Sequence, residues 1–480
     1  MRHFRSIRIL VGITVTTLVA DCGGGGGGGD TPAPSGLSYP TAPTFLVGQT
    51  ISPLSPKVTG TVSTYSVSPA LPAGLTLNGS TGVISGTPTG MTSAASYKIE
   101  ASNSGGNTIA TIILTVSSRF LYASGCSWNG PMANPYFTGG IYGFSVDLVT
   151  GVLSPVPGSP FAPTAACSLY SITLANAAPI AVTHDSKFLY SVDSAGKLLA
   201  FLIQSDGSLS AVLGAPFTVL SSPESLVAHP KLDLLYGTTS SGTVLVFTID
   251  SATGAASLTS SVDTAADLGG STLTPDGRYY YQTIPDVFGS GNNAQIAGFS
   301  TNGVTGALSS VPGSPLSLGS NLNQFPQVMA VDPAGKFLYV SNGASLQQTG
   351  YGGPMHAYSI DPVSGALTDV PGSPFGVSQW PQLSVAVDAS DRFLIVPTSP
   401  IVTANCLVVS SINPDTGALT SVPGSPFDLH CGTAVTDPSE PLVYMAGEGV
   451  DTYSIDLGTG TLNQRGEVIV PGLTRIALTH

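Results

Sequence analysis

The side chains best placed for chemistry are a few polar residues that begin apolar strands or lie in the loops beside them. Glu224 and Gln327 each precede a proline by six residues, Pro230 and Pro333, so they hold equivalent places in two copies of a repeat. Arg475 precedes the apolar residues of its strand in a similar way and is the main cation that could balance Glu224. Hydrolysis of a small substrate needs a general base with a polarising acid or cation within hydrogen-bond reach.

We therefore take Glu224, Arg475 and His430 as candidate catalytic residues. The candidate binding residues are Gln327, Gln382, Asp267 and Glu448. Taken one at a time, each is more simply a solvated loop residue, so the site depends on their convergence. Of the six histidines, His356 and His430 are the two placed for chemistry. No H-x-H, H-E-x-x-H, G-x-S-x-G, Walker or C-x-x-C motif is present, and the sequence predicts no cofactor and no metal.

An internal repeat must position these residues. A K-F-L-Y element occurs seven times, each preceded by a V-x-A-V-D-P run and followed by two more alternating apolar runs with a T-G or S-G turn. Four short strands in a period of about 50 residues are typical of a β-propeller blade. The sequence therefore predicts an all-β fold with a seven-bladed β-propeller over residues 119–480.

Propeller geometry assigns the turns to two faces. The D-P-A-G-K and D-P-x-S-G-A turns lie on one face, which we call the bottom face, and the connections after F-L-Y and between blades lie on the top face. The long insertions all fall on the top face, at 125–140, 283–294, 341–354 and 397–405. Insertions gathered on one face of a repeat protein usually mark its binding face. A ligand site is therefore expected at the top mouth of the central channel.

The repeat resembles the lactonase-like seven-bladed propellers, a family that includes 6-phosphogluconolactonases and carboxymuconate cyclases. The resemblance is carried by A-V-D-P-A-G-K-F-L-Y-V-S-N from Ala330, by Y-S-I-D-P-V-S-G-A-L from Tyr358 and by the V-P-G-S-P-F tails. It implies the fold, and a lactonase-like hydrolase if the protein is an enzyme. The family's catalytic residues have no position-by-position match here, so the resemblance assigns no site residue.

The positions of the basic residues favour a non-phosphorylated ligand. Six of them flank the F-L-Y element in bottom-face turns and are expected to be solvated: Arg119, Lys187, Lys231, Arg278, Lys336 and Arg392. Few cations are left for the top face, where a phosphorylated sugar would need a cluster of them. The formal net charge of −13 also gives no basic stripe for nucleic acid.

Residues before the repeat predict export and a separate module. Residues 1–21 have the basic start and short apolar core of a signal peptide, and L-V-A-D-C, ending at Cys22, resembles a lipoprotein cleavage site. Residues 22–36 are a glycine-rich tether. Residues 37–118 resemble the "putative Ig" modules of bacterial surface proteins, a cadherin-like sandwich. Glu100 is the one acidic residue between positions 31 and 118, which argues against a calcium site.

The cysteines and the overall pattern lead to two further expectations. In an oxidising compartment we expect disulfides Cys126–Cys167 and Cys406–Cys431, each holding a long top loop. Two functions remain open. The first, which the sequence favours, is a membrane-tethered, extracytoplasmic module that binds a small molecule, glycan or surface protein. The alternative is an exported lactonase or cyclase that acts on a non-phosphorylated lactone or sugar-derived substrate.

Overall fold

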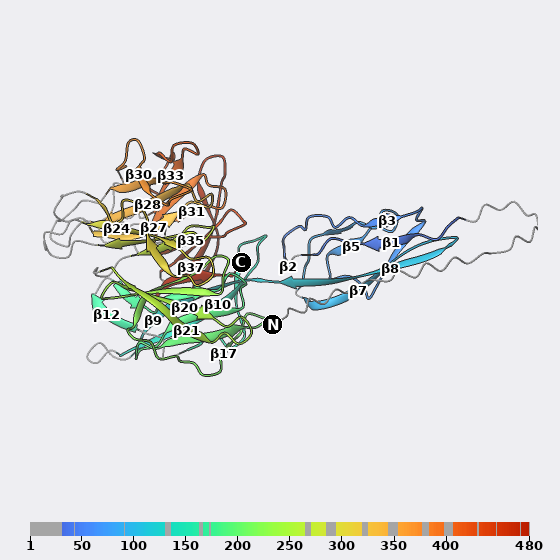
Figure 1. Cartoon of the computed structure of the whole chain (residues 1–480), viewed down its shortest axis with the longest axis horizontal. Helices are drawn as coiled ribbons and strands as arrows, with labels where there is room; N and C mark the ends of the chain where they lie inside the picture. The colour runs from blue at the N-terminus through green and yellow to red at the C-terminus, as the bar shows by residue number, and fades with distance from the viewer. Residues whose placement is uncertain are drawn as a thin grey trace, which may run out of the picture.

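The chain consists of two bodies built from strands. The computed structural model describes residues 31–42, 44–90, 92–129, 136–162, 167–171, 174–264, 270–284, 294–318, 325–343, 354–376, 384–397, 407–429, 432–447, 449–470 and 472–479. Every regular element within these ranges is a β-strand, and none of the chain described there is a helix able to cross a membrane. Figure 1 shows the smaller body (blue) extending from one side of the larger ring of sheets.

The smaller body is a β-sandwich. Its main sheet has the order β2 (Thr44–Leu46), β8 (Gly106–Ser117), β7 (Thr92–Asn103), β4 (Thr64–Ser68), and it is completed by the pairs β1 (Ser35–Ser38) with β3 (Lys57–Thr59) and β5 (Leu75–Leu77) with β6 (Ile84–Gly86). The L-P-A-G-L-T-L motif forms the β5 side of this last hairpin. Gly74 is required there because it has φ +86° and a Cβ would lie 2.0 Å from the Thr87 carbonyl oxygen.

The larger body is the predicted seven-bladed propeller, with seven four-stranded sheets ordered from the channel outward. We number the blades 1 to 7 in the order of the four lists that follow. The innermost strands are β39 (Leu473–Leu478), β14 (Ile180–Val182), β18 (Pro223–Ala228), β22 (Ser271–Leu273), β27 (Phe325–Val331), β31 (Ala386–Val387) and β35 (Thr433–Thr436). The second strands are β9 (Arg119–Asn129), β15 (Phe188–Val192), β19 (Leu234–Thr239), β23 (Tyr279–Ile284), β28 (Phe337–Gly343), β32 (Phe393–Pro397) and β36 (Leu442–Ala446).

The third strands are β10 (Tyr136–Val146), β16 (Leu198–Ile203), β20 (Thr243–Ile249), β24 (Gln295–Thr301), β29 (Met355–Ile360), β33 (Leu407–Ile412) and β37 (Gly449–Ile455). The outermost strands are β11 (Leu153–Pro155), β17 (Leu209–Ala211), β21 (Ala256–Asp263), β25 (Leu308–Ser310), β30 (Leu367–Asp369), β34 (Leu419–Ser421) and β38 (Leu462–Ile469). Two elements lie outside this scheme: β26 (Leu316–Ser317) pairs with β24, and β12 (Cys167–Ser171) pairs with β13 (Leu174–Ala177).

Blade 1 closes the ring with strands from both ends of the repeat region. Strand β39 pairs antiparallel with β9, with Ile476 opposite Ala123 and Leu478 opposite Leu121. The F-L-Y element at Phe120 therefore receives its inner strand from the C-terminal end of the repeat region. The expected insertion at 125–140 differs in form, because β9 and β10 continue into it as one long hairpin with Cys126 opposite Gly139.

A tyrosine from the F-L-Y element ties each of five blades to the next. Its hydroxyl donates to the carbonyl of the positive-φ glycine in the neighbouring blade's outer turn, at 2.7 to 3.1 Å. The pairs are Tyr122–Gly207, Tyr190–Gly254, Tyr236–Gly306, Tyr281–Gly365 and Tyr339–Gly417. Blade 6 has Ile395 at this position, and in blade 7 Tyr444 donates instead to Asp437. The F-L-Y tyrosine is therefore an inter-blade bond.

The D-x-x-T-G turns use their carboxylates locally. In one of them the Asp250 carboxylate accepts the backbone N–H groups of Ala252 and Thr253 at 3.0 and 2.8 Å. These hydrogen bonds hold the pKa of Asp250 below its usual range, and the same pattern lowers the pKa of Asp361 and Asp456. The carboxylates thus serve as turn acceptors, as the sequence indicates.

One bottom-face cation is not solvated, and this corrects the sequence interpretation. Arg119 is 2 % exposed, and its Nη1 lies 3.2 Å from Oδ1 of Asp437, which is fully buried. Its Nη2 donates to Ser439 at 3.0 Å. Asp437 belongs to blade 7 and Arg119 to blade 1, so the ion pair crosses the closing joint of the ring. Burial follows because this turn faces the neighbouring blade and the attached sandwich rather than water.

The sandwich docks on the bottom face at blades 1 and 7. Leu46 of β2 belongs to the same apolar cluster as Leu148 and Leu442. The amide of Gln49 donates to Glu440 at 3.3 Å. Gly48 lies against the blade 1 turn, where an added Cβ would stand 3.3 Å from a methyl group of Val149. The top face is therefore on the side of the ring opposite to the sandwich.

Candidate functional site

Two of the predicted catalytic residues stand on innermost strands near the top of the channel. Glu224 is on β18 of blade 3, and Arg475 is on β39 of blade 1. Between them lies β14 of blade 2, which touches both strands. The two residues therefore lie on either side of blade 2, whose inner strand is short and begins only at Ile180.

Glu224 lies in a β-bulge, and Arg475 directly follows one. The ladder between β18 and β19 shifts between Pro223 and Ser225, so Glu224 has no partner in register. The ladder between β39 and β9 shifts between Leu473 and Arg475. A bulge re-aims side chains and is over-represented next to active sites. The register also refines the predicted equivalence, because Arg475 opposite Ser124 corresponds to Ser225 opposite Thr238, one residue further along than Glu224.

The two residues interact electrostatically. Protein atoms surround Arg475, and this burial lowers the pKa of its guanidinium, whereas the negative charge of Glu224 acts in the opposite direction. The Arg475 side chain nevertheless keeps partial solvent contact, and Glu224 is exposed. The guanidinium is thus largely enclosed by protein, and Glu224 is the anion that acts on it. The catalytic role predicted for this acid and this cation stays a prediction.

A buried polar seam between blades 3 and 4 adjoins Glu224, and the sequence did not reveal it. The hydroxyls of Ser225 and Ser271 lie 3.2 Å apart, and Thr238 lies 2.8 Å from the hydroxyl of Tyr280. Gln282, cross-strand partner of Ser271, is fully buried, yet neither its amide nitrogen nor its amide oxygen has a hydrogen-bond partner. An unpaired buried amide is costly, so this seam has unused capacity to bind water or a ligand group.

The signal that could have revealed Gln282 is its position in the repeat. In R-Y-Y-Y-Q a glutamine follows the aromatic end of F-L-Y, where blades 5 and 6 carry a valine. A polar amide inside an apolar second strand has no role in packing the blade.

Several solved structures have the same architecture as the propeller. A protein described as a putative 6-phosphogluconolactonase from Bacteroides uniformis superimposes with a TM-score of 0.56 at 15 % identity, covering 76 % of this chain and all of that one (100 %). The periplasmic gluconolactonase of Pseudomonas aeruginosa gives a TM-score of 0.54 at 14 % identity, over 76 % and 99 % of the two chains. The propeller has the lactonase-like fold. At these identities the likeness concerns the fold alone.

The sandwich has its own match. Residues 33–118 match the family model described as "Putative Ig domain", so this body is the Ig-like module that the sequence predicts.

A third structural neighbour of the propeller, from Bacteroides fragilis, is also described as a putative 6-phosphogluconolactonase. The match covers 75 % of this chain with a TM-score of 0.55 and 18 % identity. No curated protein matches the chain in sequence.

The remaining candidates of the lactonase-like propeller are placed in part or not at all. Gln327 lies in the third bulge of this kind, where the β27–β28 ladder shifts between Pro326 and Met329. Cys126 and Cys167 are placed as backbone only, on β9 and β12, two strands that touch each other. Outside the described residues lie Cys22, Asp267, Gln382, Cys406, His430, Cys431 and Glu448. These assignments, including both disulfides, stay predictions.

His356 is a packing residue of the lactonase-like propeller rather than part of this site. It lies on the third strand of blade 5, is 7 % exposed and stacks on Tyr358 with a ring separation of 6.3 Å. Desolvation lowers its pKa. Because it stands away from the innermost strands, it does not join Glu224 and Arg475. Among the described residues, no group of three or more His, Cys, Asp or Glu side chains could hold a metal ion.

Proposed function

We propose that this protein is an exported lactonase-like hydrolase that opens an uncharged, sugar-derived lactone at the top mouth of its channel. The observation that supports the proposal is the electrostatic interaction of Arg475 in blade 1 with Glu224 in blade 3, on innermost strands that bulge at Glu224 and just before Arg475. From sequence alone the binding module is the favoured function. An acid and a cation converging at the channel mouth shift the preference to catalysis.

The pair can supply both halves of the chemistry. Arg475 would donate to the lactone carbonyl oxygen and stabilise the negative charge that develops on it. Glu224 would take a proton from water while the water oxygen bonds to the carbonyl carbon. The ring C–O bond then breaks, and the leaving alkoxide receives the proton from Glu224. The product is the open hydroxy acid, and Glu224 returns to its ionised form.

The charges at the site favour a neutral substrate. Arg475 is already offset by Glu224, so a phosphate would find no unbalanced cation in the pair. The periplasmic gluconolactonase among the structural neighbours is, by its name, an enzyme of a non-phosphorylated lactone outside the cytoplasm. The predicted signal peptide, lipidated Cys22 and glycine tether support the same address for this chain, at the cell envelope.

The test is lactone hydrolysis by the purified mature protein. Release of acid from glucono-δ-lactone would be followed by pH-stat titration, with the uncatalysed rate subtracted. Glu224→Gln and Arg475→Met should each lower kcat/KM by about 100-fold or more, since a positioned general base is typically worth 10² to 10⁴. The controls are Glu467→Gln and Arg465→Met, which make the same changes on the outer strand β38 of blade 7.

Three results are decisive. Loss of turnover in the two site variants, with unchanged melting and active controls, supports the assignment. Calorimetric binding of the lactone without turnover by the wild-type protein would assign the alternative, a binding module. A fall in melting temperature together with loss of activity in both site variants would reduce the two residues to a structural role, because opposite charges can also simply neutralise each other.

A further inference from the structure

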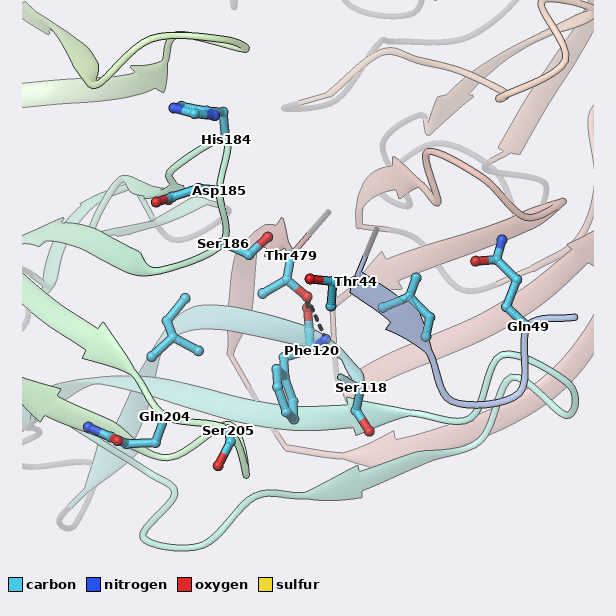
Figure 2. Close-up of a pocket in the computed structure, with 12 residues that line it drawn as sticks. Thr44, Gln49, Ser118, Phe120, His184, Asp185, Ser186, Gln204, Ser205 and Thr479 are labelled. Carbon is cyan, nitrogen blue, oxygen red and sulfur yellow. Dashed lines mark hydrogen bonds between the residues drawn. The ribbon is translucent and has the colours of Figure 1, made fainter. Parts of the chain in front are cut away.

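A cavity lies on the side of the ring opposite to the channel mouth, where the Ig-like module meets the bottom face. It has a volume of about 310 Å³. Its walls come from β2 of the module, from the closing strands of blade 1 and from two turns of blade 2, as Figure 2 shows. The lining residues are Thr44, Leu46, Gln49, Ser118, Phe120, His184, Asp185, Ser186, Ile203, Gln204, Ser205 and Thr479.

Neutral hydrogen-bonding groups dominate this cavity, which we call the junction cleft. Thr44, Ser186 and Ser205 line it with hydroxyl groups (Figure 2). Gln49 and Gln204 line it as well, and their amide nitrogens donate to Glu440 at 3.3 Å and to Ser210 at 2.7 Å. Hydroxyls and amides both donate and accept, so they can satisfy a ligand hydroxyl in either direction. Leu46 and Ile203 add apolar edges beside them.

The charged groups at the rim of the junction cleft are already balanced. Asp185 accepts from the Thr183 hydroxyl at 2.7 Å and pairs with Lys187 at 3.3 Å. These interactions hold the pKa of Asp185 below its usual range despite the opposing effect of burial, which is the largest single influence. His184 meets the Asp233 carboxylate at 3.2 Å. A charged ligand would find no unbalanced partner among these groups.

Ser186 places a hydroxyl-bearing side chain on a left-handed turn residue beside the junction cleft. It has φ +59°, in the left-handed region that disfavours side chains, within the turn between the first two strands of blade 2. In the same turn of blades 4 and 5 the chain has glycine, Gly277 and Gly335, with φ +77° and +71°. Blade 2 therefore keeps a hydroxyl-bearing residue at a position where the fold itself is better served by glycine. That residue lines the junction cleft.

We propose that the junction cleft binds a neutral sugar residue, held by the hydroxyl and amide side chains of both bodies. The volume is at the lower end of the range for small-molecule sites and suits one sugar ring. A pyranose presents hydroxyl groups that donate and accept hydrogen bonds, and apolar C–H groups between them. The uncharged polar side chains of the cleft match the hydroxyl groups, and its short apolar edges match the C–H groups. The site is separate from the channel mouth and does not depend on the proposed hydrolysis there.

The experiment uses the full mature protein and defined sugars. Saturation-transfer NMR and calorimetry would measure binding of D-glucose, D-mannose, D-galactose and N-acetyl-D-glucosamine, with D-glucuronate as the charged comparison. A hexasaccharide of any sugar that binds would show whether the source is a free sugar or a polymer, because a polymer ligand should bind at least fivefold more tightly as the longer chain. At least one neutral sugar should bind with a Kd below about 10 mM, and glucuronate at least fivefold more weakly.

Ser186→Gly is the decisive variant. If Ser186 serves the ligand, glycine should leave the melting temperature equal or higher, because it suits the left-handed turn, while the sugar affinity falls at least fivefold. Gln204→Ala, on the facing turn, should weaken binding similarly. Asp391→Gly is the matched control, since Asp391 has φ +60° in the corresponding turn of blade 6, away from the cleft. Glu224→Gln, at the channel mouth, should leave this binding unchanged.

The proposal fails if none of the neutral sugars binds, or if binding survives unaltered in the Ser186→Gly/Gln204→Ala double variant. It also fails if Glu224→Gln abolishes binding, because the sugar would then occupy the channel mouth. Binding of D-glucuronate in preference to the neutral sugars would likewise contradict it. Activity on glucono-δ-lactone in any of these variants is a separate outcome that concerns the proposed hydrolase alone.

Discussion

The ion pair at the closing joint gives an asymmetric prediction. Arg119 is buried against Asp437, but its Nε has no partner, and Nη1 meets the carboxylate at ion-pair distance without hydrogen-bond alignment. Asp437 is better provided: it accepts from the backbone N–H groups of Ser439 and Glu440 at 3.0 and 3.1 Å, and from the Tyr444 hydroxyl at 3.4 Å. Removing the anion should therefore harm the fold more than removing the cation.

The magnitudes follow from what each change leaves behind. Asp437→Asn keeps the turn acceptors but leaves a buried guanidinium without its anion, a loss of about 3–5 kcal/mol. Arg119→Met leaves the carboxylate in its other hydrogen bonds and should cost about 2 kcal/mol. Unfolding entropy of about 2.1 cal/mol/K per residue, over roughly 360 propeller residues, gives about 0.8 kcal/mol/K. The Asp437→Asn loss then corresponds to a fall in Tm of about 4–7 °C.

A double-variant cycle tests this reasoning by thermal melting followed with circular dichroism. Arg119→Met/Asp437→Asn should melt at a higher temperature than Asp437→Asn alone, since the unpaired buried charge is gone. The control is Arg278→Met, the change at an exposed arginine in the blade 4 turn, which should shift Tm by less than about 1 °C. Equal effects of the two single variants, or simple addition in the double variant, would refute the account.

Four further predictions concern other parts of the ring. Tyr190→Phe should cost about 1 kcal/mol by removing the hydroxyl bond to Gly254, measured by urea unfolding; an unchanged midpoint would mean that this bond does not hold the blades together. Burial and the charge of Asp332 raise the pKa of Asp391 to about 6, above its unfolded value, so folding takes up a proton there and stability should rise as pH falls from 7 toward 4. Asp391→Asn should raise Tm at pH 7 and reduce that pH dependence, and an identical pH profile in the variant would contradict it. Deleting residues 473–480 should unfold the propeller, so a truncated protein with wild-type melting would exclude β39 as its closing strand. Peptide mapping under non-reducing conditions should return Cys126–Cys167 and Cys406–Cys431, and free thiols or a crossed pair would reject these disulfides.

The architecture could be predicted because it repeats. Each F-L-Y run, its turn glycine and its alternating neighbours specify a blade locally, and the strand around Ile476 could be matched to Phe120 by the same pattern. The repeat also predicted that Glu224 and Arg475 lie on innermost strands. Because each of the seven blades carries this pattern, the pattern is visible in the sequence seven times.

What could not be predicted depends on contacts that occur once. Arg119 looks like its solvated counterparts in other turns, because its partner Asp437 lies 318 positions away. The buried amide of Gln282 becomes visible only when blades 3 and 4 face each other. The docking of Leu46 on blade 1 could not be predicted either, because the sequence of the Ig-like module does not indicate which surface an apolar strand residue packs against.

The closing of blade 1 has a consequence for how the protein forms as it emerges N-terminus first. All strands of the Ig-like module lie within residues 35–117, so this module can complete its sheets early. Blade 1 cannot complete its sheet early, because β9 is the first strand of the ring to emerge and its partner β39 is the last. Every other blade emerges between these two strands. Meanwhile β9 presents an unpaired edge, a hazard for wrong pairing. Glu440 of blade 7, which accepts the hydrogen bond from Gln49, is also synthesised late. The Ig-like module can therefore dock on the ring only at the last step of assembly.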